Sequence, residues 1–106
     1  IGSVVIKDRK ELSEEGVIVV SIAIDFENKK LMNNPDIISR GFVNVNESME
    51  LFGQSKAVVK EAVLSVLSSE ECGVYQVRQQ ILESLGEFLE SEIGRKPVIL
   101  PTILEV

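Results

Sequence analysis

The strongest apolar pattern in the chain lies between residues 17 and 25, where β-branched residues dominate. Its odd positions mix valine with serine, alanine and aspartate. Its even positions are all large and apolar: Ile18, Val20, Ile22 and Ile24. Because successive side chains of a strand point to opposite faces, the pattern predicts a strand with one face in the core and the other only partly covered.

The residues before this strand are interpreted as a lead-in segment, 1–15. Residues 4–6 are apolar and predict a short strand, and the charged stretch that follows predicts an exposed connection. Because the first residue is Ile1 and the opening residues read as a continuing ordered segment, we interpret the chain as a piece of a longer protein whose missing part lies upstream.

Turn-forming residues follow the central strand. Residues 27–30 are polar, and residues 33–36 break the chain more strongly around a proline, so we expect a hairpin-like excursion between them. From Arg40 to Val45 the residues alternate well enough to predict a further strand.

Two consecutive helices are predicted next. Apolar residues recur at helical spacing over 47–68 and again over 74–89. Asn46 is the expected N-cap of the first helix, and Gly94 fits the left-handed cap that ends the second.

The final apolar run, residues 98–104, predicts a strand that Pro101 confines to an edge or a bulge, because proline cannot donate to a ladder. Strands, two helices and a terminal strand in this order predict one α+β domain over residues 1–106. We expect a mixed sheet of about three to four strands with both helices packed on one face.

The composition supports one globular domain, because 44% of the 106 residues are hydrophobic and 26% are charged. No apolar run reaches the roughly 20 residues of a membrane span, and together with a single cysteine this leads us to expect a cytoplasmic protein. The net charge is −6, and residues 47–94 carry the acidic excess, which disfavours this region as an RNA-binding surface.

Catalytic chemistry is hard to place in this sequence. Histidine is absent, and Cys72 is the single cysteine. A histidine-free chain lacks the commonest general base and the commonest zinc ligand. Cys72 is interpreted as part of the turn between the helices, and pairs of glutamates such as Glu70 and Glu71 as solvated surface charges. We therefore expect no catalytic residue, metal or cofactor in this chain.

Two basic positions are candidates for RNA contact. Arg95 and Lys96 close the second helix, where a basic pair is also expected to stabilise the helix end. Arg40 lies in the apolar segment 34–42, which we interpret as a buried crossover in which Arg40 bonds backbone carbonyls, with RNA contact as the alternative.

Three blocks of the sequence resemble the C-terminal domain of bacterial ribonuclease J. They are IKDRKELSEEGVIVV at 6–20, PDIISRGFV at 35–43 and RKPVILPTILEV at 95–106, and they occur in the family's order. The resemblance implies a parent with a metallo-β-lactamase core and a β-CASP region, which degrades and processes RNA as a 5′-to-3′ exonuclease and an endonuclease. It also implies a divalent metal, zinc or similar, held by the upstream catalytic domain and not by this chain.

The resemblance further implies that this domain serves self-association and support of the catalytic region. Partners would be a second copy, a paralogue or the upstream domains, with RNA reached through the parent and no membrane partner. The absence of tryptophan and the short connection between the helices depart from the family pattern, which leaves open that the parent is the weakly active partner paralogue.

Two other functional classes stay open: a free-standing regulatory domain that binds a small ligand, and an accessory RNA-binding module. The scaffold interpretation needs an exposed apolar face, whereas a sensor needs a concave site with convergent polar groups. The candidate self-association face is the uncovered side of the sheet. Its expected residues are Val17, Val19, Ala23, Ile99 and Ile103.

Overall fold

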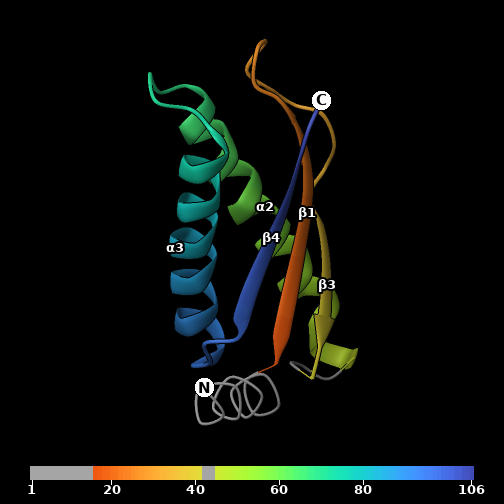
Figure 1. Ribbon diagram of the computed structural model, residues 1–106. Coiled ribbons are helices and arrows are strands. Elements are labelled where there is room, and N and C mark those ends of the chain that lie inside the picture. Colours follow the sequence, from red (N-terminus) through yellow and green to blue (C-terminus); the bar gives the residue numbers. More distant parts are fainter. Residues whose placement is uncertain (1–15, 42–44) are drawn as a thin grey trace, which may run out of the picture.

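The structure is a computed structural model that describes residues 16–41 and 45–106, with side chains from residue 49 onward in the second range. Figure 1 shows a sheet and a pair of helices that form two layers. The elements, in chain order, are β1 (Val17–Asp25), β2 (Lys30–Leu31), β3 (Asp36–Arg40), α2 (Val45–Leu67), α3 (Val74–Ile93) and β4 (Val98–Glu105). The strand predicted at residues 4–6 lies outside the described residues.

The strand β1 is the centre of the sheet. It pairs in parallel with β4, from Val17 beside Val98 to Ile24 beside Glu105. On its other side β1 pairs antiparallel with β3 and then with β2. The predicted class, an α+β domain with a mixed sheet of three to four strands, is confirmed, and so is the edge position of β4.

The segment between β2 and β3 stays attached to β1. The backbone N–H of Met32 donates to the carbonyl of Ala23 at 2.8 Å. The side-chain Oδ1 of Asn33 accepts the N–H of Ala23 at 2.9 Å, where a regular strand would offer a backbone carbonyl. The predicted excursion therefore forms one interrupted edge of the sheet, and β2 and β3 are its two regular parts.

The strand predicted from Arg40 to Val45 is wrong at the residues that the structure describes, and residues 42–44 lie outside them. The structure places β3 at Asp36–Arg40, directly after Pro35, and α2 already begins at Val45. Gly41 has a φ of 64°, a left-handed conformation that ends the strand. The segment around Arg40 is therefore an edge strand with an exposed Arg40, and the prediction of a buried crossover is also wrong.

Both predicted helices are confirmed. Gly94 adopts the left-handed cap after α3, with its N–H bonded to the carbonyl of Glu90 at 2.9 Å. The N-cap prediction at Asn46 is wrong, because α2 begins at Val45 and Asn46 is already helical. N-cap side chains lie just before the first helical residue, and residues 42–44 are not among those described.

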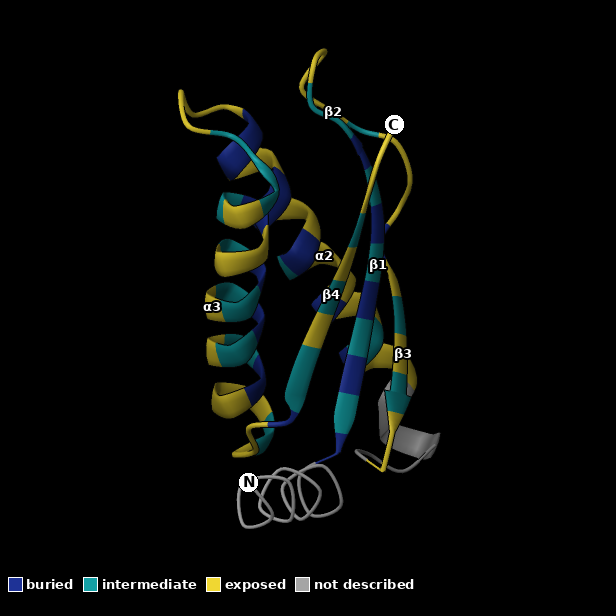
Figure 2. Cartoon of the chain, in the orientation of Figure 1, coloured by how far each residue is buried: buried dark blue, intermediate teal, exposed yellow. Residues whose placement is uncertain are grey.

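The core lies between the even face of β1 and one stripe of each helix. The α3 stripe repeats every four residues and is fully buried: Val77, Ile81, Leu85 and Leu89. In Figure 2 the buried positions of β1 and of both helices gather between the two layers. The helices α2 and α3 pack on each other and contact the strands on this side only, since α3 covers β4 and α2 covers β2 and β3.

Candidate functional site

The second face of the sheet has no helix on it among the described residues, and we call it the open face. Side chains of strand residues paired in register lie on the same face. The odd residues of β1 therefore share the open face with alternate residues of β3 and β4. Across the sheet its rows are Arg40–Val17–Val98, Ile38–Val19–Leu100, Asp36–Ser21–Thr102 and Ala23–Leu104.

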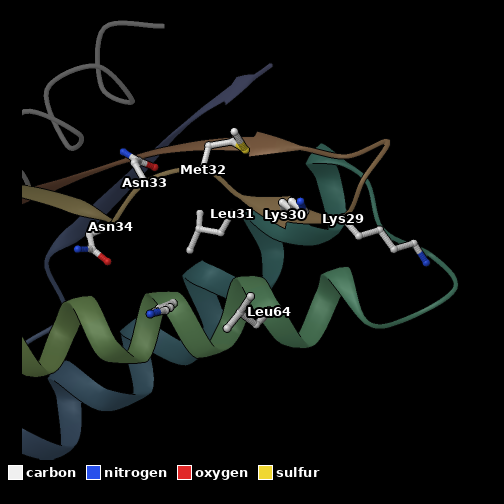
Figure 3. A pocket seen from close by; sticks show the side chains of 8 residues that line it. Lys29, Lys30, Leu31, Met32, Asn33, Asn34 and Leu64 are labelled. Atoms are coloured by element: carbon white, nitrogen blue, oxygen red, sulfur yellow. The ribbon is translucent and has the colours of Figure 1, made fainter.

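Large apolar side chains are exposed on this open face. Ile38 is 57% exposed and Leu100 47%, at the two ends of one row that has Val19 in its middle. Leu104 is also exposed. Figure 3 shows Met32 pointing away from α2, while its neighbour Leu31 points toward that helix. Exposed apolar groups gathered in this way are typical of a surface that binds another protein.

The five residues predicted for the self-association face lie on two different faces of the sheet. Val17, Val19 and Ala23 lie half-buried on the open face, as expected. Ile99 and Ile103 do not, because they sit in register with Ile18 and Ile22 and pack against the core under the helices. The prediction for these two isoleucines is therefore wrong by one residue of register, and the open face of β4 carries Leu100 and Leu104 instead.

Sequence reasoning missed Ile38, Leu100 and Leu104. In β4 both faces are apolar, so alternation alone does not decide which set is buried. One signal was available, because Thr102 is the only polar side chain between Val98 and Leu104. A polar side chain in such a strand is expected to point away from the core. Thr102 therefore indicates that the even-numbered residues of β4, which include Leu100 and Leu104, lie on the open face.

The free edge of β4 is poorly suited to strand addition. Val98 and Val106 donate their N–H groups to β1, to the carbonyls of Gly16 at 3.0 Å and of Ile24 at 2.9 Å. In a parallel ladder the backbone groups of alternate residues point to the same neighbouring strand. The even-numbered residues of β4 therefore bond to β1, and the backbone groups of the odd-numbered residues point to the free edge. Pro101 is odd-numbered, so its missing N–H costs no hydrogen bond to β1 and removes a donor from the middle of the free edge.

The candidate RNA contacts come together at one end of the sheet. Arg40 ends β3 in the same row as the start of β4, and Arg95 and Lys96 precede that strand, separated from it by Pro97. Acidic residues also occur near this end of α3, however. The Nζ of Lys96 lies 3.6 Å from Oε1 of Glu90, with both side chains exposed, and Glu92 is nearby in sequence.

A cavity of about 570 Å³ lies between the β2–β3 segment and α2. Figure 3 shows it as a wide space in which the Lys29 side chain extends away from Asn33 and Asn34. Its polar groups do not converge, and the Oδ1 of Asn33 is already bonded to Ala23. Its lining residues are Lys29, Lys30, Leu31, Met32, Asn33, Asn34, Lys60 and Leu64.

Groups with catalytic potential are scattered. In the described part of the chain, no three histidine, cysteine, aspartate or glutamate side chains lie close enough together to hold a metal ion. Cys72 is a free thiol in the α2–α3 connection and packs against the core. The pKa of Asp25 is lowered, chiefly by the hydrogen bond from the Asn28 side chain, but Asp25 belongs to a surface turn.

Residues 4–106 match the family model of the ribonuclease J C-terminal domain. The chain belongs to this family. It is 37% identical to ribonuclease J2 of Bacillus subtilis strain 168 over 106 residues, which is 100% of this chain. It is 35% identical to ribonuclease J 1 of Streptococcus pyogenes serotype M3 over 98% of the chain. It is 30% identical to ribonuclease J 2 of Staphylococcus aureus strain NCTC 8325 over all of it.

This ribonuclease J C-terminal domain spans only 19% of the length of each of those relatives. The resemblance carried by the three sequence blocks is thus supported by similarity over the whole chain. Within residues 16–41 and 45–106, neither helix has the length and apolar character needed to cross a membrane.

Proposed function

We propose that this ribonuclease J C-terminal domain is a non-catalytic oligomerisation and scaffold domain that holds subunits together through the open face. The observation that carries the proposal is the row Ile38–Val19–Leu100, an apolar band exposed on the side of the sheet without helices. Burial of apolar surface contributes roughly 25 cal/mol per Å², so a patch of a few hundred Å² per subunit favours association even after the loss of translational freedom.

The occupant of the open face would be a second copy or a paralogue of the domain. The relatives include proteins named ribonuclease J 1 and ribonuclease J 2 from the same Streptococcus pyogenes serotype, so a paralogue is a realistic alternative to an identical copy. A closed two-fold dimer is the simplest assembly for a self-complementary face.

Sedimentation velocity at several concentrations tests the proposal. We expect the wild type to self-associate and Leu100→Asp to shift it to monomer while the helical circular dichroism persists. Tyr75→Asp is the matched control, because Tyr75 is 66% exposed but lies on α3. A wild type that stays monomeric at the highest concentration contradicts the proposal, as does equal loss of association in both variants.

The parent protein is proposed to be a cytoplasmic, metal-dependent ribonuclease that acts on RNA both from the 5′ end and internally. Its metal would be bound by the catalytic domain and not by this chain. Incubation of the chain with labelled single-stranded RNA and manganese or zinc should give no cleavage. Metal-dependent cleavage that disappears when the chain's own acids are mutated would contradict this division of labour.

An accessory role in RNA binding is the second candidate, favoured by the gathering of Arg40, Arg95 and Lys96 at one end of the sheet. Against it stand the net charge of −6 and the glutamates beside the basic pair. A salt titration with single-stranded RNA separates the two roles. Micromolar or tighter binding at physiological salt, lost in Arg95→Glu/Lys96→Glu, would favour the RNA-binding role.

The regulatory small-ligand alternative has less support. The cavity beside α2 lacks convergent polar groups, and its lysine and asparagine side chains point in different directions (Figure 3). Small-ligand sites in proteins are usually more enclosed and combine an apolar lining with a few groups aimed at one point. Family membership with the ribonucleases favours the scaffold role further.

A further inference from the structure

Two opposite charges flank the apolar row of the open face at equal distances. Asp36, Ile38 and Arg40 alternate along β3 and share the open face, since Ile37 between the first two packs toward the core. With a rise of about 3.4 Å per residue, Asp36 and Arg40 lie about 7 Å on either side of Ile38. Both side chains are exposed.

The same row fixes a line across the sheet. Val19 is paired with Ile38 on one side and with Leu100 on the other, so the three side chains cross the sheet at one height. Above and below this line the open face differs in character. Arg40 and two valines lie on one side of it. Asp36, Ser21 and Thr102 lie on the other side, followed by the apolar pair Ala23–Leu104.

We infer that a second copy of the domain packs face to face on this one, with a two-fold axis along the Ile38–Val19–Leu100 row. The inference rests on the proposed function and specifies its geometry. Rotation about this axis places Arg40 of each copy opposite the partner's Asp36, so that two ion pairs form at once. Each residue of the apolar row then meets its own counterpart, and the strands of the two sheets run antiparallel.

A two-fold axis along the strands leaves the charges unpaired. A two-fold axis along β1 would place Arg40 opposite Val98 and Asp36 opposite Thr102, because these pairs are related by reflection across that strand. Charged groups covered without a partner oppose association. Side-by-side pairing of β4 edges is disfavoured by Pro101, which lacks the outward N–H such pairing needs.

Sheet twist does not remove the pairing. Packed sheets are usually rotated by about 30° relative to one another, which moves residues at this distance from the centre by about 4 Å. The flexible arginine side chain can span such a shift, and the arginine–carboxylate pair tolerates several geometries. The pattern of charges therefore selects a second copy, placed antiparallel, as the occupant of the open face.

Charge reversal tests the inference. In Arg40→Asp two aspartates would face each other in each pair, and in Asp36→Arg two arginines would. We expect each single variant to raise the dimer dissociation constant about ten-fold or more, and the double variant Asp36→Arg/Arg40→Asp to return to within about three-fold of the wild type. The control for Arg40→Asp is Arg78→Asp, which makes the same change in net charge on the exposed surface of α3.

The outcomes separate this inference from the proposed function. Weakening in both single variants with recovery in the double variant supports the antiparallel pairing. If Leu100→Asp dissociates the wild-type assembly but the charge variants behave like Arg78→Asp, the pairing is wrong and the scaffold function stands. A monomeric wild type overturns both the antiparallel pairing and the scaffold function, whether or not the chain binds the remainder of its parent protein. Circular dichroism of every variant excludes unfolding as the cause.

Discussion

A Cβ atom built on Gly16 would lie 2.8 Å from the carbonyl oxygen of Gly41 and 2.9 Å from that of Arg40. Gly16 immediately precedes β1, and Gly41 follows β3, so the two glycines hold the ends of paired strands together. The carbonyl of Gly16 also accepts the N–H of Val98, which starts β4. One backbone position thus joins the three strands at the end of the sheet where Arg40 lies.

Gly16→Ala should destabilise the domain by about 2 kcal/mol or more. The φ of Gly16 is 83°, a conformation that costs an L-residue energy, and the added methyl group would meet backbone rather than a flexible side chain. Urea unfolding followed by circular dichroism measures the change. A variant as stable as the wild type would contradict the close approach of the two strands.

Gly53→Ala should have the opposite sign and stabilise the domain by about 1 kcal/mol. Gly53 lies exposed within α2, and no atom lies within 4 Å of the Cβ that alanine would add. Alanine has a higher helix propensity than glycine, and it makes the unfolded chain less flexible. The same urea experiment serves, with the identical glycine-to-alanine change at position 16 as comparison. Loss of stability here would show that this surface of α2 is covered in solution.

Ser55→Ala should stabilise the domain by about 1 kcal/mol. Ser55 is 1% exposed on α2, and its hydroxyl has no hydrogen-bond partner among the described residues. A buried hydroxyl without a partner costs free energy, and alanine also favours the helix. Ser84→Ala on α3 is the control, because the Ser84 hydroxyl accepts a bond from Gln80 Nε2 at 2.8 Å and its removal should give no comparable gain. Destabilisation by Ser55→Ala would show that the hydroxyl is bonded in solution.

Asn28→Ala should raise the pKa of Asp25. The pKa lies below the ordinary value of 3.8 because the Asn28 side chain donates to Oδ2 at 2.7 Å and the Asn28 backbone N–H donates to Oδ1 at 3.1 Å. A lowered folded pKa means that the contribution of this turn to stability is present above the unfolded pKa and is lost as pH falls through the folded pKa. Carboxyl NMR titration reports the shift directly. Asn34→Ala, in the following segment, should leave the titration unchanged, and an unaltered Asp25 in Asn28→Ala would contradict the assignment.

Elements with a single strong periodicity were predictable from sequence. The bounds of β1 follow from alternation over 17–25, and the presence of the two helices follows from four-residue spacing such as Val77, Ile81 and Leu85, because burial of one face imposes that period. The family was also accessible, since the three sequence blocks that carry it lie within residues 4–106. The position of β3 could not be predicted from the sequence, because the residues at its two ends, Pro35 and Gly41, are equally compatible with a loop.

The order of the elements, the core face of β1 and the membership in the ribonuclease J family could all be inferred from the amino-acid sequence. Which residues share the open face became clear only from the fold. In β4 the faces are both apolar, so their assignment depends on the parallel register that places Ile99 beside Ile18 and Leu100 beside Val19. That register is set by backbone hydrogen bonds between segments about 80 residues apart, and a shift of one residue would exchange the two faces.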